Sequence, residues 1–203
     1  MANKRVVVIG GGPAGHDTAT YAARFGAEVT LIEREIVGGA AHLRDCVPSK
    51  SMIATGGALS FARRLDGMGL ANVETGVDAE HLRARIQGIE QRLEQSVTQL
   101  LTSQGVTIHR GTGRLLGPHE VCVDTSNGVV ELTADAIVLA TGSRPRIPEW
   151  APIDRERVLT TRDAYPPCLL YTSPSPRDQR GAGVGGGGGK KKRGGGGGGG
   201  GGG

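Results

Sequence analysis

Residues 6–33 read VVVIGGGPAGHDTATYAARFGAEVTLIE, and this stretch decides the fold. The apolar, β-branched run over 6–9 is typical of a buried parallel strand. Small and apolar residues at helical spacing predict a helix over 14–25, with Gly26 as the residue that follows its end. A second strand is expected over 28–33. Strand, glycine-rich turn, helix and strand together form a βαβ unit with a right-handed crossover.

The turn of this unit carries the pattern Gly10-x-Gly12-x-x-Gly15, and an acid, Glu33, closes the second strand. Gly10 permits a tight turn, Gly12 lets the backbone approach a pyrophosphate, and Gly15 lets the helix pack closely on the strand. The open N–H groups at the helix N-terminus favour phosphate, and the acid suits a ribose diol. The alternative is a turn of purely structural meaning, which the acid at the expected spacing disfavours.

The rest of the sequence completes an α/β domain. An irregular segment is expected over 38–48, followed by helices over 49–65 and 79–103. After them the hydrophobic period changes towards two, the turn signal Ser126-Asn127-Gly128 separates two strands, and a last apolar strand is predicted over 132–142. We expect a three-layer, doubly wound, Rossmann-like fold in which a parallel sheet carries the glycine motif and a β-meander covers one face.

Charge and cysteine content exclude several classes of function. The formal net charge is +4, but residues 168–203 hold six basic residues and one acid, so the rest of the chain is close to neutral. A near-neutral body argues against nucleic-acid binding. Cys46, Cys122 and Cys168 stand at unrelated spacings, and the five histidines lack metal-ligand spacing. We therefore expect no metal site, and, without a signal peptide or an apolar span, a soluble cytoplasmic protein.

Two further motifs bear on which dinucleotide binds. Residues 38–50 read GGAAHLRDCVPSK, and residues 137–145 read IVLATGSRP. With the glycine motif, they resemble the pyridine nucleotide-disulfide oxidoreductase family over about residues 4–165. The resemblance implies that the first glycine motif binds FAD and that NAD(P)H is the hydride donor. It places the cofactor contacts at Gly10, Gly12, Pro13, Ala14, Gly15, Glu33, Arg34, Gly38, Gly39, Lys50, Gly113, Ala140, Thr141 and Gly142.

The family's redox motif has two cysteines, and here Ala41 stands at the first position while Cys46 matches the second. A lone thiol cannot cycle between dithiol and disulfide within one chain. The resemblance, which includes quinone-reducing members without the first cysteine, therefore implies direct transfer of electrons from FAD to a quinone. Three alternatives stay open: a dihydrolipoamide dehydrogenase that uses a cysteine elsewhere, a soluble transhydrogenase, and a non-catalytic FAD-binding fragment.

Cys46 and Lys50 are the candidate catalytic residues. Cys46 lies near a predicted helix N-terminus, one turn before Lys50, so a thiolate beside the flavin is one interpretation and a packing cysteine is the other. The family's lysine at the position of Lys50 lies near the reactive edge of the flavin, where a cation would stabilise the reduced ring. A surface lysine at a helix start is the alternative.

The C-terminal sequence differs sharply from the rest. From residue 181 onward it holds 17 of the 36 glycines, and LLYTSPSPRD at 169–178 resembles translated sequencing adapter. We expect an FAD-binding domain over 1–165 and a disordered, non-native tail over 166–203. The family continues into an NAD(P) domain and an interface domain. The resemblance thus implies a homodimer for the full-length protein and a fragment that does not turn over alone.

Overall fold

The structure, a computed structural model, describes residues 4–65, 68–70, 76–155 and 157–164. The predicted tail over 166–203, with Cys168, lies outside these residues. The described residues divide into two compact units, one with residues 4–51, 78–155 and 157–164 and the other with residues 52–65, 68–70 and 76–77, and the sheets belong to the first. Within the described part of the chain, no helix is long and apolar enough to cross a membrane.

The order of elements follows the sequence prediction closely. The first βαβ unit and the long helix over 79–103 are confirmed. Gly26 follows the first helix with φ +85°, in the left-handed region where glycine is favoured. The elements are β1 (Arg5–Ile9), α1 (Pro13–Arg24), β2 (Glu28–Glu33), the π-helical turn η1 (Ala41–Cys46), α2 (Val47–Ala62), α3 (Ala79–Ser103), β3 (Thr107–Arg110), β4 (Thr112–Gly117), β5 (Glu120–Thr125), β6 (Gly128–Thr133), β7 (Ala136–Leu139) and α4 (Thr161–Ala164).

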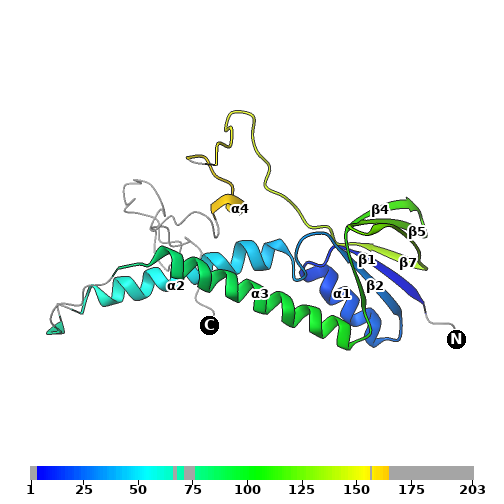
Figure 1. Ribbon diagram of the computed structural model, residues 1–203, viewed down its shortest axis with the longest axis horizontal. Helices are drawn as coiled ribbons and strands as arrows, with labels where there is room; N and C mark the ends of the chain where they lie inside the picture. Colours follow the sequence, from blue (N-terminus) through cyan, green and yellow to red (C-terminus); the bar gives the residue numbers. More distant parts are fainter. Residues whose placement is uncertain (1–3, 66–67, 71–75, 156, 165–203) are drawn as a thin grey trace, which may run out of the picture. The chain divides into compact units, whose positions relative to one another are not determined.

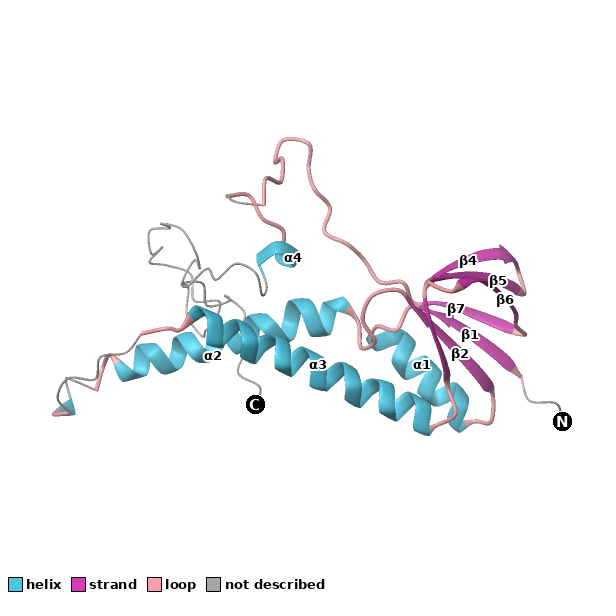
Figure 2. Cartoon of the chain, in the orientation of Figure 1, coloured by secondary structure: helices cyan, strands magenta, loops and turns pink. Residues whose placement is uncertain are grey.

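Four parallel strands form the main sheet, in the order β3-β2-β1-β7 (Figure 1). The chain moves outward from β1 through β2 to β3 and then returns to the other side of β1, which is the strand order of a doubly wound sheet. Strands β4, β5 and β6 form a separate antiparallel meander (Figure 2). The carboxyl ends of β1, β2 and β7 therefore lie together at one edge of the main sheet.

The two faces of the main sheet are covered by different layers. Helices α1 and α3 contact the strands on one face, and the meander lies over the other (Figure 2). Because side chains alternate along a strand, Val8 of β1 is buried in the helix-side core, whereas Val7 and Ile9 are buried under the meander. Each such side chain contributes roughly 2 kcal/mol through burial. Both faces of β1 are thus apolar, as its continuous hydrophobic run predicts.

Three local expectations need correction. The strand predicted over 132–142 is two strands, because Leu132 belongs to β6 of the meander and β7 begins only at Ala136. The segment 38–48 is not irregular throughout, since η1 forms a π-helical turn that leads directly into α2. Strand β4 was not expected, because TGRLLG lacks a strand pattern and becomes a strand by pairing with β5.

Candidate functional site

The glycine turn joins the ends of three elements. Gly10 follows β1 with φ +107°, and a Cβ there would collide with the carbonyl of Ala140, just after β7. A Cβ on Gly15 would collide with the carbonyl of Gly10. These two glycines therefore permit the close approach of β1, β7 and α1, and Gly15, which is buried, has the packing role that the motif predicts.

Gly12 differs from its neighbours because its missing side chain leaves open space. Its φ is −70°, and a Cβ there would have only the Cα of Gly39 within 4 Å, at 3.8 Å. Gly12 also caps α1 without a side-chain hydrogen bond, and Pro13 follows at the first helical position. Because the first N–H groups of a helix have no partner within it, this end can bind an anion that approaches Gly12.

Glu33, at the end of β2, is held by two backbone hydrogen bonds. Its Oε2 accepts from the N–H of Gly11 at 2.7 Å, and its Oε1 accepts from the N–H of Glu35 at 2.7 Å. Each carboxylate oxygen can accept more than one hydrogen bond. The group is therefore fixed in place, yet it can still accept from the two hydroxyls of a ribose.

A pocket of about 550 Å³ connects these features. The predicted cofactor contacts that line it are Gly10, Gly12, Pro13, Ala14, Glu33, Arg34, Gly39, Gly113, Ala140, Thr141 and Gly142. Gly15, Gly38, Cys46 and Lys50 are not among the lining residues. The structure thus brings most of the predicted set together at the carboxyl edge of the parallel sheet, where ligands bind in open α/β folds.

The π-helical turn η1 begins at Ala41 and ends at Cys46, the two positions that match the family's redox motif, and we call it the redox turn. A π-helical turn is closed by hydrogen bonds between residues five apart, and the N–H of Val47 donates to the carbonyl of His42 in this pattern. Ala41 and Cys46 have the same separation. Ala41 is exposed and lines the pocket, while Cys46 is half-buried with a free thiol. Lys50, on α2, is exposed.

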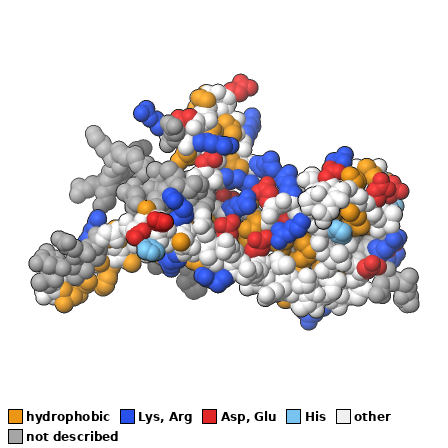
Figure 3. Space-filling model, viewed as in Figure 1, with side chains coloured by type: hydrophobic (Ala, Val, Ile, Leu, Met, Phe, Trp, Pro, Cys, Tyr) orange, Lys and Arg blue, Asp and Glu red, His pale blue; other side chains and the backbone are white. Residues whose placement is uncertain are grey.

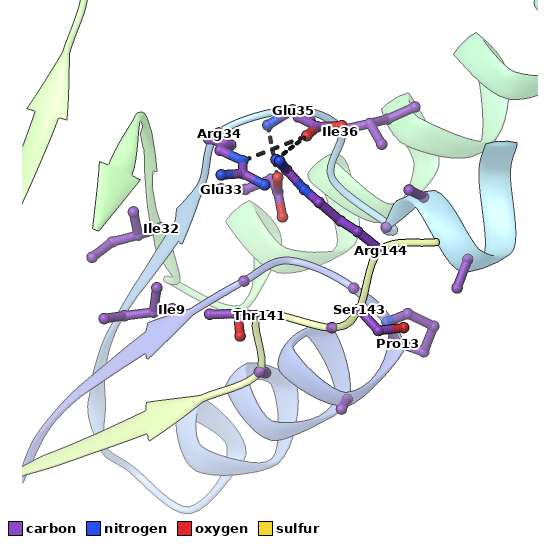
Figure 4. A pocket seen from close by; sticks show the side chains of 18 of the residues that line it. Ile9, Pro13, Ile32, Glu33, Arg34, Glu35, Ile36, Thr141, Ser143 and Arg144 are labelled. Carbon is purple, nitrogen blue, oxygen red and sulfur yellow. Dashed lines mark hydrogen bonds and ion pairs between the residues drawn. The ribbon is translucent and has the colours of Figure 1, made fainter. Parts of the chain in front are cut away.

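The sequence analysis did not name four charged residues that line the pocket. They are Glu35, Asp45, Arg144 and Arg162. Figure 4 shows the Arg144 side chain extending from the loop after β7 to Glu35, above Glu33. Arg144 lies inside the quoted motif over 137–145, so its proximity had a sequence signal. Arg162 has none, since only the tertiary fold brings α4 to the pocket.

The resolved pKa shifts lie on supporting groups outside the pocket lining. The hydroxyl and the N–H of Thr160 both donate to Asp163, which lowers the pKa of that carboxyl below its usual value. This arrangement holds the first turn of α4, which carries Arg162. The N–H of Arg5 donates to Asp135 at 2.7 Å and lowers the pKa of Asp135, which fixes the start of β7 against β1.

Charged side chains of both signs are intermingled on the face seen in Figure 3. This pattern agrees with the near-neutral body of the chain and with a small-molecule pocket.

The glycine turn, the open helix end and the fixed acid suit a dinucleotide, so the fold and the site define an α/β domain of Rossmann type. The chain belongs to the pyridine nucleotide-disulphide oxidoreductase family, whose model matches residues 4–187.

Relatives in this family carry two kinds of name. The chain is 36% identical over 173 residues to an NAD(P)H dehydrogenase (quinone) from Mycobacterium tuberculosis, covering 79% of this chain and 35% of the relative. It is 30% identical over 168 residues to a dihydrolipoyl dehydrogenase from Bacillus subtilis, covering 78% and 35%. The chain thus spans about a third of the length of these relatives.

Solved structures agree with the fold. The crystal structure of LpdA from Mycobacterium tuberculosis matches with a TM-score of 0.72 and 33% identity, over 82% of this chain and 38% of that one. The flavoprotein disulfide reductase RclA from Escherichia coli matches with a TM-score of 0.61 and 21% identity, over 73% and 31%. The second likeness shows the fold alone.

Proposed function

We propose that this chain is the FAD-binding part of an NAD(P)H oxidoreductase that passes electrons directly to a quinone. The observation that carries the proposal is the redox turn, where Ala41 lines the pocket at the position five residues before Cys46. The family's disulfide cannot form there. The similarity to the relative named NAD(P)H dehydrogenase (quinone) also supports a quinone as the electron acceptor.

The residues around the pocket fit FAD at its two polar parts. The open space at Gly12 and the N-terminus of α1 would receive the diphosphate, because a side chain there would fill the space it needs. Glu33, already oriented by two N–H groups, would accept from the ribose of the adenosine half. Gly113 lines the pocket and packs so closely under Ile9 that a Cβ would lie 3.1 Å from it, which leaves backbone rather than side chain beside the adenine.

The proposed acceptor follows from the absence of a cysteine at residue 41, in the part of the pocket that Ala40 and Ala41 line. FAD, when bound, supplies two-electron transfer between a nicotinamide and an acceptor. Cys46 is a free, half-buried thiol, and without a partner at residue 41 it cannot store two electrons as a disulfide. An apolar, planar acceptor suits this end, because Ala40 and Ala41 line it with small apolar side chains. Lys50 remains a proposed cation for the reduced ring.

A second candidate, a dihydrolipoamide dehydrogenase, is favoured by the relatives that carry the name dihydrolipoyl dehydrogenase. The two candidates differ in how the flavin reacts with the substrate that is not the nicotinamide. Dihydrolipoamide exchanges electrons with flavin through a dithiol and disulfide pair, whereas a quinone takes them from the flavin itself. A half-reaction on bound flavin therefore separates them.

The test uses the chain reconstituted with FAD, freed of unbound flavin and kept anaerobic. After photoreduction, addition of menadione should restore the visible absorbance of oxidised flavin, and dihydrolipoamide added to the oxidised form should leave that absorbance unchanged. Bleaching by dihydrolipoamide would favour the second candidate. A chain that retains no flavin would refute both. Cys46→Ser in the same assay decides whether the thiol takes part.

A further inference from the structure

One carboxylate, that of Glu35, pairs with arginines from four parts of the chain. Arg34 precedes it, Arg44 lies on η1, Arg144 follows β7, and Arg162 lies on α4. The nitrogen–oxygen distances to Glu35 are 2.8 Å from Arg44, 3.4 Å from Arg34, 3.4 Å from Arg162 and 3.5 Å from Arg144. We call these five residues the Glu35 cluster.

The Glu35 cluster lies on the pocket. Glu35, Arg34, Arg144 and Arg162 line it, and Arg44 belongs to the turn that ends at Cys46. In Figure 4 the side chain of Arg144 reaches over the pocket to Glu35. The side chains of Glu35 and Arg162 are 28% and 27% exposed, whereas those of Arg44, Arg34 and Arg144 are 38%, 46% and 61% exposed, so the pair with Arg162 is the one least screened by water.

Attraction between the four arginines and the diphosphate of FAD does not explain why a carboxylate, Glu35, lies among them. FAD carries a diphosphate, and four guanidinium groups attract it whether or not Glu35 is present. The negative charge of Glu35 offsets part of that attraction. Any contribution of Glu35 to FAD binding must therefore come from geometry. Its ion pairs connect the end of β2 with η1, the loop after β7 and α4.

We propose that Glu35 is a positioning residue for FAD. Its carboxylate acts through Arg44, Arg144 and Arg162, and it fixes the redox turn relative to the ribose-binding end of the pocket. The backbone N–H of Glu35 holds Glu33 independently of the side chain, so a change of side chain leaves that bond in place. This inference rests on the proposed function, because it takes FAD as the ligand.

Glu35→Gln is the informative change, since it keeps the shape and removes the charge. We expect the dissociation constant for FAD, measured by quenching of flavin fluorescence at low salt, to rise about tenfold. The visible circular dichroism of the bound flavin at saturation should also change, because Arg44 is on the turn that carries Cys46. A purely Coulombic role predicts the opposite sign, with tighter binding after the carboxylate is removed.

Glu90→Gln is the matched control. It removes a carboxylate that pairs with Arg44 at 3.5 Å but does not line the pocket, and it should change FAD affinity by no more than about twofold. Glu35→Asp keeps the charge with a shorter reach and should give intermediate affinity. Thermal melts without FAD show whether each variant is folded. If Glu35→Gln does not fold, the FAD affinity of Glu35→Asp tests the positioning role instead.

The outcomes separate this inference from the proposed function. If the unaltered chain binds FAD, and Glu35→Gln binds it equally well or better with an unchanged flavin spectrum, Glu35 has no positioning role and the proposed function stands. If the unaltered chain does not bind FAD, the proposed function fails and the inference fails with it.

Discussion

Gly12→Ala separates ligand binding from folding. Gly12 has a φ of −70°, which alanine adopts without strain, and its added methyl would meet only the Cα of Gly39, at 3.8 Å. Replacing glycine by alanine at such a φ stabilises a protein by about 0.4–1 kcal/mol through the unfolded chain, and alanine at a helix N-cap costs roughly as much, so the two effects nearly cancel. We therefore expect the melting temperature without ligand to change little.

FAD binding, in contrast, should weaken. The methyl would occupy the space through which a diphosphate reaches the N–H groups of α1, because Gly12 lines the pocket. A loss of about 2–3 kcal/mol, which is a rise of roughly 30- to 150-fold in the dissociation constant, is the expected size for a displaced diphosphate contact. Flavin fluorescence titration measures the affinity, and differential scanning calorimetry measures the stability.

Gly57→Ala is the control, because Gly57 lies in α2 with open space around it. It should raise stability by about 0.5–1 kcal/mol and leave FAD affinity unchanged. Two results would contradict the reasoning. Undiminished FAD affinity in Gly12→Ala would show that the diphosphate binds elsewhere, and a large loss of stability would show that the site is not open.

Three other changes test the fold and the redox turn. Gly15→Ala should destabilise the chain by about 3 kcal/mol in chemical denaturation, since its methyl would collide with the carbonyl of Gly10. Ala41→Cys should form a disulfide with Cys46 and should let dihydrolipoamide bleach the bound flavin. The variant would hold four cysteines, so thiol titration under oxidising conditions should find two free thiols, and four would refute this. The N–H of Arg5 lowers the pKa of Asp135 below its ordinary value. The contribution of this carboxylate to stability is therefore present at pH above the unfolded pKa and is lost as the pH falls through the lower, folded pKa. Asp135→Asn should therefore be less stable than the unaltered chain at pH near 7, and the difference in melting temperature should disappear in acid.

Local sequence signals were sufficient where a single segment determines its own structure. The run 6–9, the glycine turn and the strand ending at Glu33 predict a βαβ unit, because hydrophobic period, turn chemistry and helix ends all lie within it. The same holds for α3, whose apolar spacing gave both of its ends. Most of the predicted cofactor contacts lie on one pocket for this reason, since the carboxyl ends of adjacent parallel strands meet at one edge.

Pairing between segments was less predictable. Strand β4 has no strand signal of its own and is defined by hydrogen bonds to β5, and the predicted strand over 132–142 splits because Leu132 pairs within the meander. The π-helical form of η1 likewise depends on packing, with Leu43 buried at its centre. Strand propensity in particular depends on neighbours that a single sequence does not identify.

The sequence by itself determined the βαβ unit, the place of the ligand turn and the missing cysteine at residue 41, because each depends on residues adjacent in the chain. Only the tertiary structure decided that one carboxylate at residue 35 would meet arginines from η1, the loop after β7 and α4. The physical reason is distance along the chain. Arg162 lies 127 residues from Glu35, and no local pattern reports a contact that the folded sheet and its connections create.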